Sequence, residues 1–117
     1  FKDGIFVSIH CNASTDSKVQ GIEVFYHPSS GKGEKLAKII YQALGQLGRI
    51  GRGVKSANFY VLKWTRLPAV LVECGFITNP EEAIWIKEHI AELALGIVKG
   101  IEDYRNLEKE NRSKIIC

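Results

Sequence analysis

Runs of apolar residues alternate with amphipathic segments along this chain. Two runs, Ile5–His10 and Ala69–Glu73, are apolar at nearly every position, which is typical of strands covered on both faces of a sheet. Gly21–His27 and Asn58–Leu62 are rich in β-forming residues, so they are predicted as two further strands. The glycine-rich residues 51–53 are predicted as a loop.

Helical spacing marks three other segments. Between residues 32 and 47 one predicted buried stripe is formed by Leu36, Ile39, Ile40, Ala43, Leu44 and Leu47. Asn79 followed by Pro80 and Glu82 has the residue pattern of a helix start with a capping box, and a short helix to about residue 88 is expected. In a longer last helix the predicted stripe is Ile90, Leu93, Ala94, Ile97, Val98, Ile101 and Tyr104.

The order of these elements predicts an α/β fold, with a mostly parallel twisted sheet flanked by helices. A chain of 117 residues with 45% apolar and 25% charged residues fits one ordinary domain with a sizeable core. We expect this domain to cover residues 1–104. Residues 105–117 form a polar tail that we expect to be frayed or disordered.

Charge and cysteine content exclude several classes of protein. The net charge is +3, and the tail accounts for +2 of it, so the rest of the chain has no dense basic stripe and nucleic-acid binding is not expected. The three cysteines are odd in number and lack CxxC spacing, which argues against a disulfide framework or a thiolate metal site. The apolar runs are too short to cross a bilayer.

Two polar residues stand where predicted strands end. His10 closes the first strand and Glu73 closes the fourth. The carboxyl ends of parallel strands meet at one edge of a sheet, so the fold can bring these distant residues together. An imidazole beside a carboxylate suits a metal site with a general base.

Other interpretations of the same residues stay open. A histidine at a strand end is often only hydrogen bonded, and a glutamate there often caps a turn. A Cys–His hydrolase that uses Cys11 or Cys74 is a further alternative. Adjacent residues of a strand point to opposite faces, which argues against direct cooperation of Cys11 with His10.

Two segments resemble a known enzyme family. Phe6–Ala13 reads FVSIHCNA and resembles the FVSIHxNA motif of the zinc-dependent N-acetylmuramoyl-L-alanine amidases of the Amidase_3 type. Pro68–Asn79 reads PAVLVECGFITN and resembles the PavLvExGFxsN segment of that family, and Gly21–Tyr26 resembles the strand between the two motifs. The resemblance covers roughly residues 3–104. It implies a zinc hydrolase that cuts the amide bond between N-acetylmuramic acid and L-alanine in peptidoglycan.

The resemblance also implies roles for single residues. His10 corresponds to a zinc ligand, and Glu73 corresponds to the general base that takes a proton from water. Asn12, Arg52 and Asn58 become candidates for contact with the substrate. The parent protein would act on the bacterial cell wall, as a secreted autolysin or as a phage or spore lysin, and a separate wall-binding domain would suit it.

The chain departs from the family pattern before His10. The family holds zinc with two histidines and one glutamate, and its first histidine and the glutamate come from segments upstream of the FVSIH motif. The nine residues before His10 contain neither histidine nor glutamate, and the sequence lacks Met. We therefore expect a processed or truncated chain without the family's N-terminal strand and helix. The alternative is a non-catalytic wall-binding or scaffolding remnant of the same fold.

Overall fold

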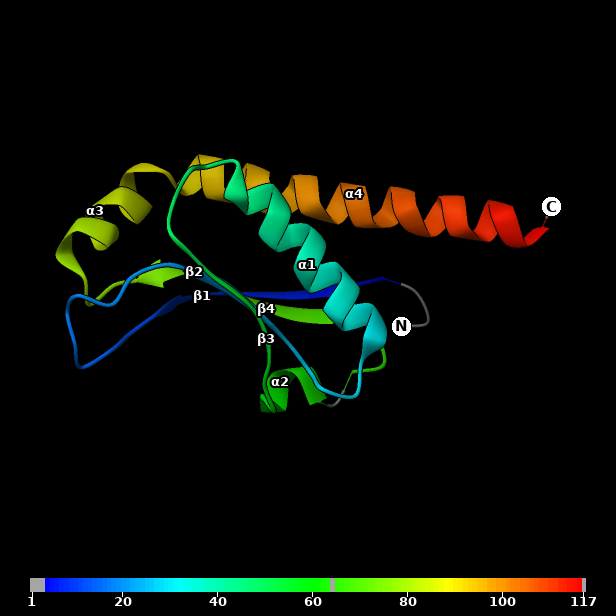
Figure 1. The fold of residues 1–117 in the computed structure, drawn as a ribbon, viewed down its shortest axis with the longest axis horizontal. Helices are drawn as coiled ribbons and strands as arrows, with labels where there is room; N and C mark the ends of the chain where they lie inside the picture. The colour runs from blue at the N-terminus through cyan, green and yellow to red at the C-terminus, as the bar shows by residue number, and fades with distance from the viewer. Residues whose placement is uncertain (1–3, 64, 117) are drawn as a thin grey trace.

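A four-stranded sheet carries most of the helices on one face (Figure 1). The computed structural model describes residues 4–63 and 65–116. The strands lie in the order β1-β4-β2-β3, and their bounds are β1 Phe6–Asn12, β2 Ile22–Tyr26, β3 Gly51–Ser56 and β4 Ala69–Phe76. β1 pairs with β4 and β2 pairs with β3 in parallel, whereas β2 runs antiparallel to β4. The predicted α/β fold with a mostly parallel sheet is confirmed, and one antiparallel pair is added.

The four helices cover the two faces of the sheet unequally. They are α1 Gly31–Gly45, α2 Tyr60–Lys63, α3 Pro80–Glu88 and α4 Ile90–Ile116. α1 and α4 pack on one face, where the main core includes Val24, Val70, Val72, Leu36, Ile40, Leu93 and Ile97. The short α2 covers part of the other face, where Leu62 packs with Ala69 and Leu71. Within the described residues, no helix combines the length and the apolar character that crossing a membrane requires.

The predicted strand at Asn58–Leu62 is wrong. The third strand is Gly51–Ser56, and residues 60–63 form one helical turn instead. Glycine has a low strand propensity, so the Gly-Arg-Gly sequence concealed this strand. Pairing with β2 overrides the low propensity, and a side chain at Gly51 would collide with the hydroxyl of Tyr41. The prediction therefore placed the third strand at residues 58–62, whereas it lies at residues 51–56.

The predicted frayed tail is also wrong, because α4 continues to Ile116. Residues 105–113 contain no glycine or proline and are rich in good helix formers. Tyr104 is buried, and Lys35 of α1 lies 3.8 Å from the carboxylate of Glu108, which holds this part of α4 close to α1. These contacts extend the helix well past residue 104.

The buried stripe of α4 is narrower than predicted. Leu93, Ile97 and Tyr104 are buried, whereas the predicted members Ile90, Ala94 and Val98 are exposed. α4 approaches α1 most closely at its glycines, since a Cβ atom at Gly100 would lie 2.7 Å from the Cα of Ile40. This contact turns the face that contains the glycines toward α1 and leaves residues 90, 94 and 98 on the flank.

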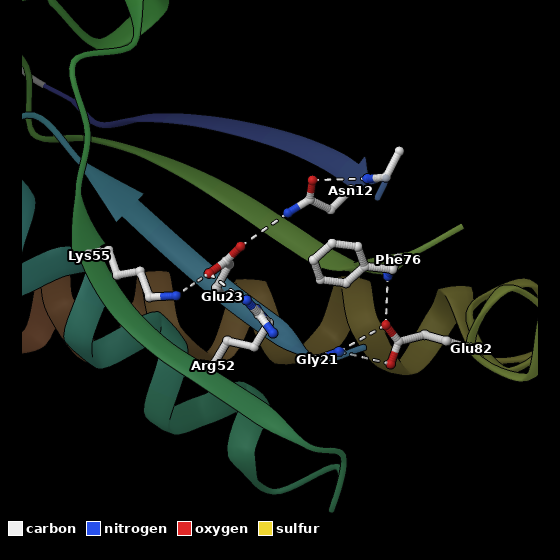
Figure 2. A network of polar contacts seen from close by, with 8 residues as sticks. Asn12, Gly21, Glu23, Arg52, Lys55, Phe76 and Glu82 are labelled. Carbon is white, nitrogen blue, oxygen red and sulfur yellow. Dashed lines mark hydrogen bonds and ion pairs between the residues drawn. The ribbon is translucent and has the colours of Figure 1, made fainter. Parts of the chain in front are cut away.

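The start of α3 is confirmed in part. Asn79 is the N-cap and accepts a hydrogen bond from the backbone N–H of Glu82 at 3.2 Å. The carboxylate of Glu82 does not close the expected capping box. It accepts from the backbone N–H of Phe76 at 2.6 Å and of Gly21 at 3.0 Å (Figure 2). This buried carboxylate therefore joins the end of β4, the entry to β2 and the first turn of α3.

We predict that Glu82→Ala lowers the free energy of unfolding by about 3 kcal/mol, because two buried N–H groups lose their acceptor. Glu81→Ala is the matched control, since Glu81 precedes it in the same helical turn and is exposed. It should change stability by less than about 0.5 kcal/mol. Urea unfolding followed by circular dichroism measures both variants. Equal stability of the two variants would contradict the structural role of Glu82.

Candidate functional site

His10 and Glu73 are register partners on the neighbouring strands β1 and β4. Register partners point to the same face of a sheet, and here it is the face opposite α1 and α4. His10 is exposed, and its Nε2 lies 2.7 Å from the hydroxyl of Ser8 in a hydrogen bond. The fold thus brings His10 and Glu73 together, although neither ends its strand as predicted, because β1 continues to Asn12 and β4 continues to Phe76.

Glu73 is a buried carboxylate with unused hydrogen-bonding capacity. It is 9% exposed, and its Oε2 atom is buried with no hydrogen-bond partner among the described residues. Burial raises the pKa of Glu73 above its ordinary value, His10 opposes that rise, and the negative charge of Glu23 adds to it. In this environment the carboxylate of Glu73 takes up a proton more readily than an ordinary glutamate does.

Glu23 is a second buried carboxylate, on the other side of Glu73. It is the register partner of Glu73 on β2 and is 4% exposed. In contrast to Glu73, it is fully bonded (Figure 2). The side-chain amide of Asn12 donates to its Oε1 at 3.0 Å, Lys55 donates to its Oε2 at 2.8 Å, and Arg52 lies 3.6 Å from that oxygen.

A polar network beside Glu73 spans β1, β2 and β3. It consists of Glu23, Asn12, Lys55 and Arg52. Two cations compensate the charge of Glu23, whereas none of the ion pairs in the described chain involves Glu73. Neighbouring acids in such different environments are typical of sites where one carboxylate is structural and the other reacts. Glu23 thus has the partners of a structural carboxylate, whereas Glu73 has no ion pair among the described residues.

The three predicted substrate-contact residues lie in two places. Asn12 and Arg52 both contact Glu23, the register partner of Glu73. The guanidinium of Arg52 also lies 5.3 Å from the centre of the Phe76 ring. Asn58 lies beyond the opposite end of β2, where its Oδ1 is 3.1 Å from the Nε2 of His27. The structure therefore does not bring Asn58 next to Glu73.

Sequence reasoning missed Glu23 and Lys55. The one available sign was a charged residue inside the β-forming run GIEVFY, because a glutamate in a covered strand needs partners. Its partners come from β1, which is separated from β2 in the sheet by β4, and from β3, which lies beside β2 in the sheet but follows α1 in the chain. The strand order, which the sequence does not show, is what creates this network.

The described residues do not complete a zinc site. No group of three or more His, Cys, Asp or Glu side chains in this part of the chain is placed to hold a metal ion. A catalytic zinc usually takes three protein ligands and one open position. Of such a ligand set, His10 would supply one member.

The cysteines do not support a thiol nucleophile. Burial raises the pKa of Cys74 to about 12, and burial together with Glu73 raises the pKa of Cys11. Both side chains are free cysteines that stay protonated at neutral pH, and the thiolate is the reactive form. Cys117 lies outside the described residues. This environment argues against the Cys–His hydrolase alternative.

We predict that Glu73→Gln stabilises the metal-free chain at neutral pH by about 1 kcal/mol, as removal of a strained functional group often does. The raised pKa means that folding favours the protonated acid, so the stability of the parent chain falls as pH rises through that pKa. The neutral amide should remove this decline. Thermal unfolding from pH 4 to pH 8 measures it, with the exposed Glu81→Gln as control. A variant less stable than its parent at pH 8 would contradict this account of Glu73.

Comparison with known proteins agrees on one family. A family model described as N-acetylmuramoyl-L-alanine amidase matches residues 1–103. The N-acetylmuramoyl-L-alanine amidase LytC of Bacillus subtilis (strain 168) is 40% identical over 89 residues, which cover 74% of this chain and 18% of LytC. An endolysin of Bacillus phage SPP1 is 35% identical over 119 residues, which cover 94% of this chain and 43% of the endolysin.

A solved structure has the same fold. The CwlD amidase from Clostridioides difficile, in complex with the GerS lipoprotein, matches with a TM-score of 0.85 at 32% identity. The match covers 91% of this chain and 56% of the CwlD chain. The chain spans about half or less of the length of the curated relatives it matches, between 18% and 50% for the first of them.

Proposed function

Because this chain belongs to the Amidase_3 family of N-acetylmuramoyl-L-alanine amidases, we propose that it carries the general base of a peptidoglycan amidase. The bond cut would be the amide between N-acetylmuramic acid and L-alanine. The observation that supports this best is the pairing of Glu73 with His10 on the face of the sheet away from α1 and α4. The Oε2 atom of Glu73 is buried there and has no hydrogen-bond partner among the described residues, so it keeps an unused acceptor position.

Glu73 would move one proton through the reaction. Its carboxylate takes a proton from the attacking water while the water oxygen bonds to the carbonyl carbon of the substrate. It then gives that proton to the amide nitrogen as the carbon–nitrogen bond breaks, which releases L-alanine with a free amino terminus. The raised pKa suits this exchange, because a carboxyl group with a pKa nearer neutrality accepts and returns protons more evenly.

His10 is our candidate for metal binding. The family is generally zinc-dependent, and a bound zinc ion lowers the pKa of water and polarises the scissile carbonyl. The imidazole of His10 would serve as a ligand in its neutral form, so we expect activity to fall at acid pH. A catalytic zinc ion needs further ligands besides His10. The described residues contain no group of three or more His, Cys, Asp or Glu side chains that could supply the full set.

Asn12 and Arg52 are our candidates for substrate contact near Glu73, since both side chains border the site through Glu23. Asn58 would contact only a substrate that continues about 13 Å in the direction of β2, since its partner His27 lies four positions after Glu23. The substrate polymer and its location imply that the protein acts at the bacterial cell wall. The length of the relatives leaves room for a wall-binding domain in the parent.

A non-catalytic scaffold of the same fold is the second candidate. The observation that favours it is the missing three-ligand group in the described part of the chain. Retention of a buried, unpartnered glutamate favours the enzyme, because a scaffold gains nothing from that unfavourable burial. The product of the reaction separates the two candidates.

We predict that the parent enzyme, incubated with purified peptidoglycan, produces new amino termini on L-alanine. A zinc chelator should abolish their formation. Amino-terminal labelling of the digest measures the product, and reducing sugar ends are assayed in parallel. New reducing ends would identify a glycosidase, and the absence of both products would support the scaffold.

We predict different effects for the two site residues in the intact enzyme. Glu73→Gln should keep zinc and lose about two to four orders of magnitude in rate, because the amide cannot accept a proton. His10→Ala should lose both zinc and rate. Metal analysis beside turnover measures each variant. Zinc lost from Glu73→Gln but kept by His10→Ala would reverse the two assignments, and near-normal turnover of Glu73→Gln would exclude it as the base.

A further inference from the structure

A groove lies at the end of the molecule far from Glu73. It runs between the start of β1, the first turn of α1 and the late turns of α4, and its volume is about 560 Å³. Its lining residues include Gly4, Ile5, Lys32, Tyr104, Arg105, Glu108, Lys109 and Arg112. All of the α4 residues among them lie beyond residue 103, where the family match ends, whereas Gly4, Ile5 and Lys32 lie within the match. The groove therefore lies where the matched amidase domain meets the part of α4 that continues past the match.

The groove concentrates the positive charge of the chain. Four cations line it, namely Lys32, Arg105, Lys109 and Arg112, against one anion, Glu108. Their excess of three equals the net charge of +3 of the whole sequence, so the remaining residues sum to zero. Glu108 is already engaged, since its carboxylate lies 3.8 Å from Lys35 of α1. The charge of the groove is thus strongly segregated and little compensated.

The cations are arranged along a line and do not converge on one point. Arg105, Lys109 and Arg112 follow one another at helical spacing, so they share one face of α4 over about 10 Å. All three side chains are exposed, as is Lys32 at the start of α1. The positive end of the α1 dipole adds to the potential at that point. An extended chain of negative charges fits this arrangement better than a single small anion.

We propose that this groove binds a linear, phosphate-bearing polymer of the cell wall. Each phosphate neutralised by a cation releases condensed counterions, which is a strong and salt-dependent source of affinity. The choice of a wall polymer rests on the proposed function, because an amidase works in the layer where such polymers accompany peptidoglycan. The positive charge of the groove is independent of amidase activity.

The test compares two variants of equal net charge. The groove variant is Arg105→Gln/Lys109→Gln/Arg112→Gln. The control variant, Lys18→Gln/Arg66→Gln/Lys87→Gln, removes three exposed cations elsewhere on the chain. Circular dichroism checks that both keep the fold, and a third variant, Arg105→Lys/Arg112→Lys, keeps the charge in the groove. Binding of linear poly(glycerol phosphate) is measured by titration calorimetry at several salt concentrations.

We expect the 117-residue chain to bind with a logarithmic salt slope of about −2 to −3, which corresponds to three or four phosphate contacts. The groove variant should lose at least about tenfold in affinity and most of the slope, whereas the control variant and the lysine variant should stay within about threefold. Equal losses in the groove and control variants would overturn the proposal, because net charge alone would explain them. Tighter binding of duplex DNA at equal phosphate concentration would also overturn it, in favour of a nucleic-acid ligand. The polymer contains no amide bond, so a failed amidase assay leaves this result intact.

Discussion

Burial of the Glu82 carboxylate is the constraint on which the arrangement of the sheet depends. The carboxylate is 2% exposed and holds the backbone N–H groups of Phe76 and Gly21, three residues after Glu73 and two residues before Glu23 (Figure 2). The antiparallel register of β2 against β4 follows from these two anchor points, and it places Glu23 opposite Glu73. Gly75 makes the anchor sterically possible, since a Cβ atom there would lie 2.7 Å from the Glu82 carboxylate.

The site that results contains two buried acids in opposite environments. Glu23 receives an amide and two cations, so its burial stabilises the alignment of three strands. Glu73 has no such partner among the described residues, and its burial opposes folding at neutral pH. The fold maintains this unfavourable group because the surrounding network and the Glu82 anchor fix the backbone on both sides of it. A general base needs surrounding structure that is stable enough to hold a carboxylate whose burial lowers the stability of the fold.

The sequence predicted the parts of the site that depend on local pattern. β1 and β4 are continuous apolar runs, so both strands were found, and their parallel pairing is confirmed, although each strand continues past the predicted last residue. β3 was missed because its glycines have low strand propensity and its pairing with β2 is a tertiary effect. Glu23 and Lys55 were missed for a related reason, since their contact depends on the order of strands in the sheet. The roles of His10 and Glu73 in catalysis stay predictions.

The unexpected continuation of α4 past residue 104 connects the hydrophobic core to the groove. Leu93, Ile97 and Tyr104 pack the helix onto the core, and the same rigid helix then carries Arg105 and Arg112 to the groove at the start of β1. A frayed tail would spread those cations over many conformations and lose the linear arrangement. β1 runs from this groove toward His10, a distance of about 16 Å along the strand. The groove lies on the face of the sheet that α1 and α4 cover, whereas the side chain of Glu73 lies on the opposite face. A polymer held in the groove would therefore not cover the candidate site.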